Sequence, residues 1–272
     1  MKLDIAVPAG EMYSKLIINK DLVEEKYGIR VLVLEENKCA DLMLNNRVKA
    51  ALLSPIGYGK GVVNADYRII PGPGLAAFYY TGLASIIFRE GVNQIKTLAT
   101  SQHDSFIVKI GMRLLQENYG MDPKIINADK ELKGRDTDAS IIIGKHNNNK
   151  GLDITEEWYM FSDLSLPLAF WVCRSEEYPE NILEIINDLA ENPAEHEEIV
   201  SEYPNMPSSE ENRTGKIIRH WNDEFERGLE YTFRFLFYVQ DLPVIPAIKI
   251  LGQDEIKHST SSIKAILEDT KK

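Results

Sequence analysis

Residues 48–58, VKAALLSPIGY, decide the fold of this chain. Residues typical of a buried strand run directly into Ser54, Pro55 and a glycine-containing turn, so the sequence predicts a short strand followed at once by a helix. A junction of this kind leaves unpaired backbone N–H groups at the carboxyl edge of a sheet, where open α/β sheets bind small ligands. The stretch therefore predicts an α/β protein with a ligand site at a sheet edge.

The same arrangement recurs at two further places. Residues 96–104, KTLATSQHD, lead from a strand into a helix, and residues 140–146, SIIIGKH, close a third short strand. Hydroxyl or glycine residues end each strand and leave backbone N–H groups free for a ligand. Three such strand ends in one chain predict a binding cleft for a small anion.

The charge of the chain limits its partners. The net charge is −11, which argues against nucleic acid because binding to phosphates needs a cationic surface. The acidity is concentrated between residues 176 and 230, where 16 acidic residues accompany 4 basic ones. The rest of the chain is therefore close to neutral, and a cleft outside this region can accept a small anionic metabolite.

Neither a leader nor a membrane span is expected. The amino-terminal residues MKLDIAVP lack an apolar signal core, and no window holds the uninterrupted apolar run that a spanning helix needs. Cys39 and Cys173 stand alone, without CxxC spacing, and are expected to be buried, reduced and structural. These features together predict a cytoplasmic protein.

Hydrophobic periodicity predicts two α/β units and a helical carboxyl-terminal region. In the first unit, strands at 3–7, 29–34 and 48–53 alternate with helices at 11–27 and 38–46; in the second, strands at 96–99, 124–126 and 139–143 alternate with a helix at 102–119 and a helical turn at 129–133. Strands at 83–88 and 166–173 cross between the units, and helices are expected at 179–189, 193–203, 210–220 and 223–238.

This order of elements predicts a two-lobed α/β fold, in which each lobe is a mainly parallel sheet flanked by helices. Residues 1–84 and 174–272 are assigned to lobe one, and residues 85–173 to lobe two. A cleft between two such lobes would collect the strand ends described above.

Several segments, taken in order, resemble a known family. They are LSPIGY at 53–58, GLASIIF at 82–88, LATS at 98–101, IIIG at 141–144, and the tryptophan-to-LPLAFW pattern at 158–171. In these segments the chain resembles the type II periplasmic-binding-protein fold and, within it, the cytoplasmic menaquinone-biosynthesis enzymes of the futalosine route, which include chorismate dehydratase. The resemblance implies a cofactor-free lyase of menaquinone biosynthesis that acts on a chorismate-like carboxylate.

The resemblance fails at one position. The dehydratase pattern carries an asparagine and a Leu-Pro pair just after the first strand, whereas this chain reads VPAGE at 7–11. Glu11 stands near the missing asparagine, where it either favours the start of a helix through the macrodipole or acts as a base. The fold is therefore expected to match the family more closely than the reaction.

The start of the helix near residue 102 has two interpretations. Ser101-x-x-Asp104 before an apolar helix face is typical of a capping box, which satisfies the first N–H groups of a helix. Alternatively, those N–H groups, Thr100, Ser101 and Ser105 hold a carboxylate or phosphate of a ligand. Ser54 has the same two interpretations, as a cap or as a ligand contact.

Two histidines lie at strand-to-helix junctions, and His103 joins Glu11 as a candidate for proton transfer. No spacing of histidines, cysteines or carboxylates brings three metal ligands together, so no metal is expected, and the family resemblance implies that no other cofactor is needed. Tyr80, Thr81 and Gly82 precede the crossover strand and are expected to floor the cleft. The expected ligand contacts are Pro8, Gly10, Ser54, Ile56, Tyr80, Thr81, Gly82, Thr100, Ser101, Ser105, Gly144 and His146.

Two functions remain open at this point. One is the lyase that the resemblance implies, with a small anionic organic metabolite as its substrate. The other is a non-catalytic solute-binding or ligand-sensing protein of the periplasmic-binding-protein superfamily. The sequence leaves the oligomeric state open, with a homodimer among the alternatives.

Overall fold

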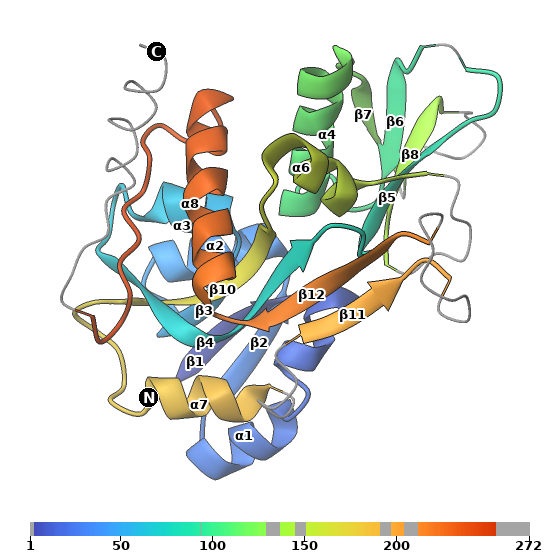
Figure 1. Ribbon diagram of the computed structural model, residues 1–272. Helices are drawn as coiled ribbons and strands as arrows, with labels where there is room; N and C mark the ends of the chain where they lie inside the picture. Colours follow the sequence, from blue (N-terminus) through green and yellow to red (C-terminus); the bar gives the residue numbers. More distant parts are fainter. Residues whose placement is uncertain are drawn as a thin grey trace, which may run out of the picture.

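A computed structural model describes residues 3–92, 94–128, 137–144, 151–190, 197–203 and 212–253. The chain forms two α/β lobes, each built around its own sheet (Figure 1). Within the described ranges, no helix combines the length and apolar character of a membrane-crossing segment. The predicted two-lobed α/β fold is confirmed, and the predicted turn at 129–133 lies outside the described residues.

The larger lobe contains a seven-stranded sheet in the order β11-β12-β4-β10-β3-β1-β2. β1 pairs in parallel with both β2 and β3, whereas the other neighbouring strands pair antiparallel. The bounds of the strands are β1 Asp4–Pro8, β2 Arg30–Leu34, β3 Ala50–Leu53, β4 Tyr67–Phe78, β10 Leu166–Arg174, β11 Glu197–Ser201 and β12 Thr214–His220.

The prediction of a mainly parallel sheet is wrong for most of this lobe. Only the three strands nearest the amino terminus follow the alternating strand–helix pattern that gives parallel pairing. β10 enters the sheet on its way back from the smaller lobe, and it therefore runs against β3. β4, which leads into the smaller lobe, pairs antiparallel with β10 for the same reason.

The smaller lobe contains a five-stranded sheet in the order β7-β6-β8-β5-β9. β6 pairs in parallel with β7 and β8, while β5 pairs antiparallel with β8 and β9. This sheet is therefore mixed rather than mainly parallel. The bounds of the strands are β5 Ala84–Phe88, β6 Thr97–Thr100, β7 Lys124–Asn127, β8 Ala139–Ile143 and β9 Leu152–Asp153.

Helices cover both faces of the larger sheet and pack against the smaller one. α2, α3 and α8 lie on one face of the larger sheet, and α1 and α7 lie on the other (Figure 1). Tyr58, Phe170 and Phe233 anchor the core of this lobe, and the ring centroids of Phe170 and Phe233 each lie 5.5 Å from that of Tyr58. The helix bounds are η1 Glu11–Leu16, α1 Lys20–Tyr27, α2 Glu36–Leu44, α3 Pro55–Gly61, α4 Phe106–Tyr119, α6 Ile154–Ser162, α7 Ile182–Leu189 and α8 Asp223–Tyr238.

The carboxyl-terminal region is only partly helical. The helices expected near 179–189 and at 223–238 are present as α7 and α8. The helices expected at 193–203 and 210–220 are wrong, because the described parts of these segments form β11 and β12. β12 pairs with β4, so tertiary pairing overrides the helix preference of its charged residues. The single helix expected at 11–27 is divided into η1 and α1.

The strand expected at 166–173 is present, but it belongs to the larger sheet. The predicted second lobe, 85–173, therefore wrongly includes β10, and its boundary belongs before this strand. The chain crosses between the sheets at residues 79–83 and again at 163–165, on either side of the smaller sheet. The division of the chain into two domains otherwise stays a prediction.

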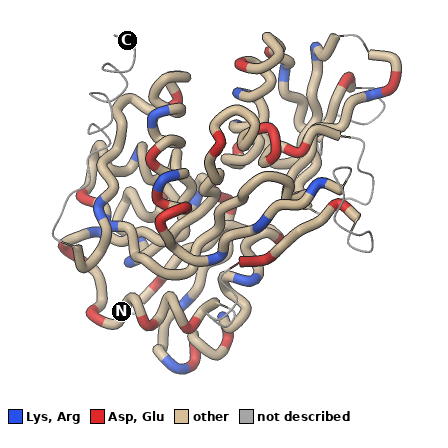
Figure 2. The backbone as a smooth tube through the Cα atoms, in the orientation of Figure 1, with Lys and Arg blue, Asp and Glu red and all other residues tan. Residues whose placement is uncertain are grey.

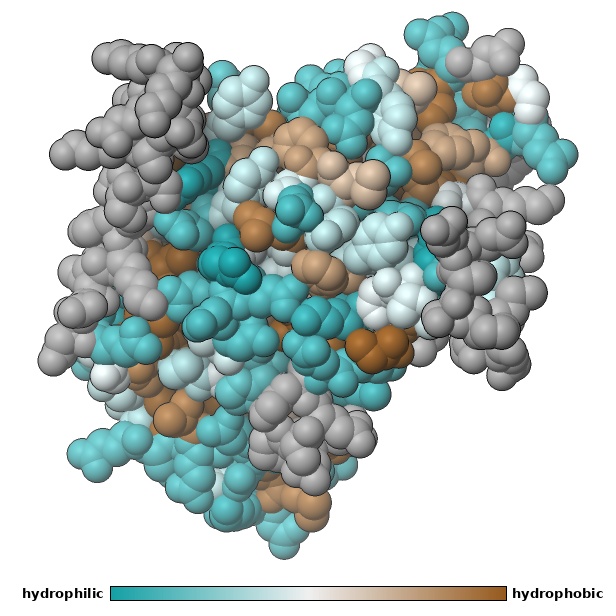
Figure 3. All heavy atoms as spheres, viewed as in Figure 1, coloured by the Kyte–Doolittle hydropathy of each residue, from teal (hydrophilic) through white to brown (hydrophobic). Residues whose placement is uncertain are grey.

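The acidic region is tied to the rest of the larger lobe by ion pairs. Glu198 on β11 lies 3.2 Å from the Lys15 ammonium, and Asp188 on α7 lies 2.7 Å from the Lys26 ammonium. Blue and red residues accordingly alternate over this lobe in Figure 2. Figure 3 shows hydrophilic residues over most of the larger lobe and apolar residues around α6, where Met160 and Phe161 are exposed.

Candidate functional site

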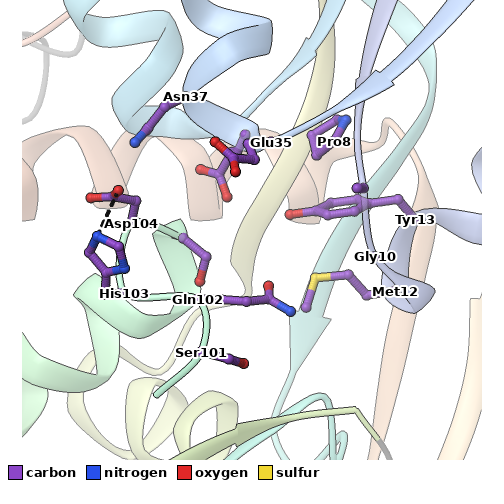
Figure 4. Close-up of a pocket in the computed structure, with 13 residues that line it drawn as sticks. Pro8, Gly10, Met12, Tyr13, Glu35, Asn37, Ser101, Gln102, His103 and Asp104 are labelled. Atoms are coloured by element: carbon purple, nitrogen blue, oxygen red, sulfur yellow. Dashed lines mark ion pairs between the residues drawn. The ribbon is translucent and has the colours of Figure 1, made fainter. Parts of the chain in front are cut away.

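A pocket of about 470 Å³ lies between the two lobes. The larger lobe lines it with residues from the end of β1 to η1 and with the start of α2, and the smaller lobe lines it with the loop between β6 and α4 (Figure 4). We call this cavity the interlobe pocket. Its lining residues are Pro8, Ala9, Gly10, Met12, Tyr13, Glu35, Glu36, Asn37, Ser101, Gln102, His103, Asp104 and Ser105.

Parallel strand pairing brings the two segments of the larger lobe together. In the register of β1 and β2, Pro8 lies beside Leu34, so both strands end at the same edge of the sheet. The Ala9 N–H extends this pairing by donating a hydrogen bond to the Leu34 carbonyl at 2.6 Å. Carboxyl ends of parallel strands are the usual ligand-binding edge of such a sheet. The pocket therefore lies at the carboxyl edge of the parallel part of this sheet.

Glu36 connects the two lobes inside this pocket. It is the first residue of α2, and its carboxylate accepts a hydrogen bond at 3.1 Å from the N–H of Phe106, the first residue of α4. The Ser54 hydroxyl also bonds to this carboxylate. Burial raises the pKa of Glu36, while the bonds from Ser54 and Phe106 and the charge of Lys109 oppose the increase. The pocket therefore contains a carboxyl group that holds its proton more tightly than usual.

Tyr13 is a second titratable group with a shifted pKa. Its side chain is buried, and its hydroxyl points into the pocket below Glu35 (Figure 4). Burial and the negative charge of Glu36 raise its pKa well above the usual value. Tyr13 therefore stays neutral at physiological pH and can donate a hydrogen bond to a ligand.

The loop between β6 and α4 presents polar groups to the pocket from the smaller lobe. His103 Nε2 lies 3.0 Å from Asp104 Oδ2, and both side chains are exposed. Ser105 is the N-cap residue of α4 but makes no side-chain capping bond. Its Oγ is shut off from solvent and has no hydrogen-bond partner within the described chain. The capping box expected at Ser101 and Asp104 is wrong, because α4 begins only at Phe106.

Five of the expected site residues line the interlobe pocket: Pro8, Gly10, Ser101, His103 and Ser105. Ser54 lies beneath it and touches it through Glu36, while its hydroxyl accepts the Gly57 N–H at 3.4 Å as the cap of α3. Thr100 is buried, and its hydroxyl accepts a hydrogen bond from the Gln102 N–H. This bond stabilises the start of the loop between β6 and α4.

The expected residues next to the crossover support the link between the lobes. The Thr81 and Thr155 hydroxyls are 2.8 Å apart in a buried contact, and the Gly82 N–H donates to the Asp153 carboxylate at 2.8 Å. The Tyr80 ring lies 4.6 Å from the guanidinium carbon of Arg213. None of these expected residues lines the interlobe pocket, and neither does Ile56, which is buried in α3.

Glu11 and Gly144 face each other from opposite lobes. The Glu11 Oε2 atom lies 3.8 Å from the position that a Cβ atom on Gly144 would take. Gly144 has a φ of 104°, which favours glycine. Both residues lie outside the lining of the interlobe pocket, and His146 lies outside the described residues.

The sequence reasoning missed the larger lobe's second contribution to the pocket. Tyr13 and the start of α2, at Glu35, Glu36 and Asn37, were not expected there. The sequence did contain a signal for these residues. The polar residues EEN at 35–37 directly follow the apolar strand VLVL, just as polar or small residues follow the three strands whose ends were recognised. Three carboxyl groups and no lysine or arginine line the described pocket, so its charged side chains are mostly acidic.

The two sheets and the pocket between them define a two-lobed fold of the type II periplasmic-binding-protein kind. The chain belongs to the menaquinone biosynthesis family, whose model matches residues 10–230. No curated protein sequence matches the chain. The predicted resemblance to this fold and family is thereby confirmed.

Solved structures resemble this chain at low sequence identity. A protein of Bordetella bronchiseptica RB50 is 11% identical, with 69% of each chain covered and a TM-score of 0.50. Protein AF1704 from Archaeoglobus fulgidus is 14% identical over 88% of this chain and 78% of its own, with a TM-score of 0.48. The periplasmic aliphatic sulphonate binding protein SsuA from Escherichia coli is 11% identical over 94% and 96% of the two chains, with a TM-score of 0.48.

Proposed function

We propose that the interlobe pocket binds a small carboxylate metabolite of menaquinone biosynthesis and that the protein acts on it as a cofactor-free, chorismate dehydratase-like lyase. The carrying observation is Glu36, whose carboxyl group lines the pocket with a raised pKa. A carboxyl group shifted upward from its usual range is closer to the pKa that suits proton transfer near neutral pH. The family and the two-lobed fold support a role in this pathway.

Glu36 supplies both proton transfers of a dehydration in this proposal. Its carboxylate takes a proton from the carbon next to the one that bears the leaving oxygen. The electrons of that C–H bond form a C=C bond, the C–O bond breaks, and the oxygen leaves as water with the proton that Glu36 returns. Tyr13 is placed to donate a hydrogen bond to the leaving oxygen, since its raised pKa keeps it protonated.

The ligand carboxylate would be held by neutral donors. Backbone N–H groups and hydroxyls of the loop at 101–105 line the pocket, whereas lysine and arginine do not within the described lining. Glu35, across the pocket, is an acceptor and suits a hydroxyl group of the ligand. The arrangement therefore favours a hydroxylated carboxylate, which has acceptors for the loop and donors for the acidic side.

His103 and Glu11, the two candidates for proton transfer expected from the sequence, have lesser roles in this proposal than Glu36. His103 lines the pocket and is oriented by Asp104, so it is the alternative base. Glu11 lies near Gly144 of the opposite lobe, outside the lining of the pocket. The expected cytoplasmic location belongs to this proposal as well, and it agrees with two buried cysteines that are not paired.

Incubation with chorismate and mass spectrometry of the products tests this function. The wild type should release a product that has lost one water, and Glu36→Gln should lower the rate about 100-fold or more. Glu35→Gln is the matched control, because Glu35 lines the same pocket without bonding to α4, and it should retain most of the activity. Chorismate that binds without reacting would contradict the lyase and support the solute-binding alternative; absence of both binding and turnover would contradict the whole proposal.

A further inference from the structure

The start of α4 carries two polar features beside the interlobe pocket. The N–H of Phe106 is bonded to Glu36, which belongs to the opposite lobe. The neighbouring residue Ser105 lines the pocket, and its Oγ atom is shielded from solvent and has no partner within the described chain. A carboxylate group is thus already bound at this helix start, beside a hydroxyl that still lacks an acceptor.

We propose that Glu36 is a displaceable internal ligand of the interlobe pocket, and that a ligand carboxylate takes its place at the start of α4. The inference rests on the proposed function in one respect, namely that the ligand carries a carboxylate. It adds that the chain blocks its own carboxylate subsite until the ligand arrives.

The donors at this position suit a free carboxylate better than they suit Glu36. A carboxylate has two acceptor oxygens, and Glu36 uses Oε2 for the Phe106 N–H while Ser105 stays unpaired. The N–H groups of the first helical turn lack acceptors within the helix, and the helix dipole favours a negative charge there. A ligand carboxylate that enters the pocket can bond both Phe106 and Ser105, which supplies the acceptor that Ser105 lacks.

Displacement leaves Glu36 able to act as the base of the proposed dehydration. Once displaced, Glu36 would lie near a second negative charge, which disfavours its ionised form and strengthens its hold on a proton. Burial already raises its pKa in the present arrangement, and the charge of the ligand acts in the same direction. The groups that act on Glu36 from the packed elements are Ser54, Lys109, Asp104, Tyr13, Cys39 and the Phe106 N–H.

The competing interpretation is that Glu36 is a permanent cap that only ties the lobes together. Acetate distinguishes the two, because it is a carboxylate that fits the subsite without requiring catalysis. In Glu36→Ala, acetate should raise the melting temperature relative to chloride at equal ionic strength, with an affinity about tenfold or more above that of the wild type. Glu35→Ala is the matched control and should respond like the wild type.

Two further variants complete the test. Glu36→Ala combined with Ser105→Ala should lose most of the acetate response, because the second donor is gone. If Glu36→Ala does not fold, Glu36→Gln keeps the size of the side chain and should show a smaller acetate response of the same sign. Absence of an acetate response in every folded Glu36 variant would overturn the inference. Since the readout needs neither chorismate nor turnover, its failure is distinguishable from failure of the proposed lyase.

Discussion

The guanidinium of Arg113 on α4 donates two hydrogen bonds to the carboxylate of Asp241, at 3.0 and 2.6 Å. Asp241 follows α8 in the larger lobe, so this pair joins the two lobes at a second point, two helical turns beyond Phe106. Two-point bonds between arginine and a carboxylate are stronger and more directional than single ones. α4 is therefore held against the larger lobe both at its start and along its length.

Loss of this pair should loosen the contact between the lobes. Arg113→Ala should lower the free energy of unfolding by about 0.5–1.5 kcal/mol, since the pair is partly exposed, and should increase the radius of gyration in small-angle scattering. Arg89→Ala is the control, because the pair of Arg89 with Asp138 lies within the smaller lobe. Equal radii for both variants would show that the pair does not hold the lobes together.

The raised pKa of Glu36 predicts a specific pH dependence. The folded protein binds this proton more tightly than the unfolded chain, so the contribution of Glu36 to stability is greatest below the ordinary carboxyl pKa of 4.5 and is lost as the pH rises through the raised value. Glu36→Gln should remove this part of the decrease. Denaturant midpoints measured at increasing pH test the prediction, with Glu35→Gln as the control. Parallel curves for wild type and Glu36→Gln would contradict it.

Both cysteines should be unreactive in the folded protein. Cys39 and Cys173 are fully buried, and burial raises the pKa of each thiol to about 12, so almost no thiolate exists at neutral pH. A thiol-alkylating reagent should label neither cysteine in native buffer and both after denaturation, as measured by intact-mass spectrometry. Rapid native labelling of either one would show that its site opens.

Gly215 on β12 should not tolerate a side chain. A Cβ atom there would collide with the backbone oxygens of Phe78 and Tyr80, which cannot move without breaking the pairing with β4. Gly215→Ala should therefore destabilise the protein by about 2 kcal/mol or more in denaturant melts. Gly57→Ala in α3 meets its nearest atom at 3.5 Å and should be neutral or stabilising by up to about 1 kcal/mol. A wild-type midpoint for Gly215→Ala would refute the close approach.

Ser101 separates ligand binding from stability. It is exposed and does not cap α4, so Ser101→Ala should change the free energy of unfolding by less than about 0.5 kcal/mol. If its hydroxyl contacts the ligand carboxylate, affinity for chorismate should fall about tenfold or more, as measured by calorimetric titration. An unchanged dissociation constant would place the carboxylate elsewhere in the pocket.

Local patterns predicted the elements that build the binding edge. The strand ends at Ser54 and Thr100 were recognised because a short apolar run followed by hydroxyl residues is a local pattern that indicates the end of a strand. The same rule missed Glu36, because two glutamates after a strand also have an ordinary interpretation as the first turn of a surface helix. What gives Glu36 its role is Phe106, 70 positions away in the chain, and no local pattern encodes that contact.

The error at β11 and β12 has a related cause. The segments predicted as helices there, 193–203 and 210–220, contain several glutamate, lysine and arginine residues, which favour helices when considered alone. Lys216 is placed by its bonds to Glu197 on β11 and Glu224 on α8, and the strand itself is placed by its pairing with β4. These partners are distant in sequence, and local helix propensity takes no account of such contacts, so it could not predict the strands.

β4 and β10 are neighbours in the larger sheet, and the smaller lobe lies between them in the sequence. Ala77 and Leu166 are register partners, although the whole smaller sheet lies between them in the sequence. The lobe is thus an insertion into a β-hairpin, and its entry and exit points coincide. Because the entropy of closing a loop grows only slowly with its length, the hairpin can accommodate so large an insertion at little additional cost. The smaller lobe can therefore vary in length and content over evolution without disturbing the sheet that carries it.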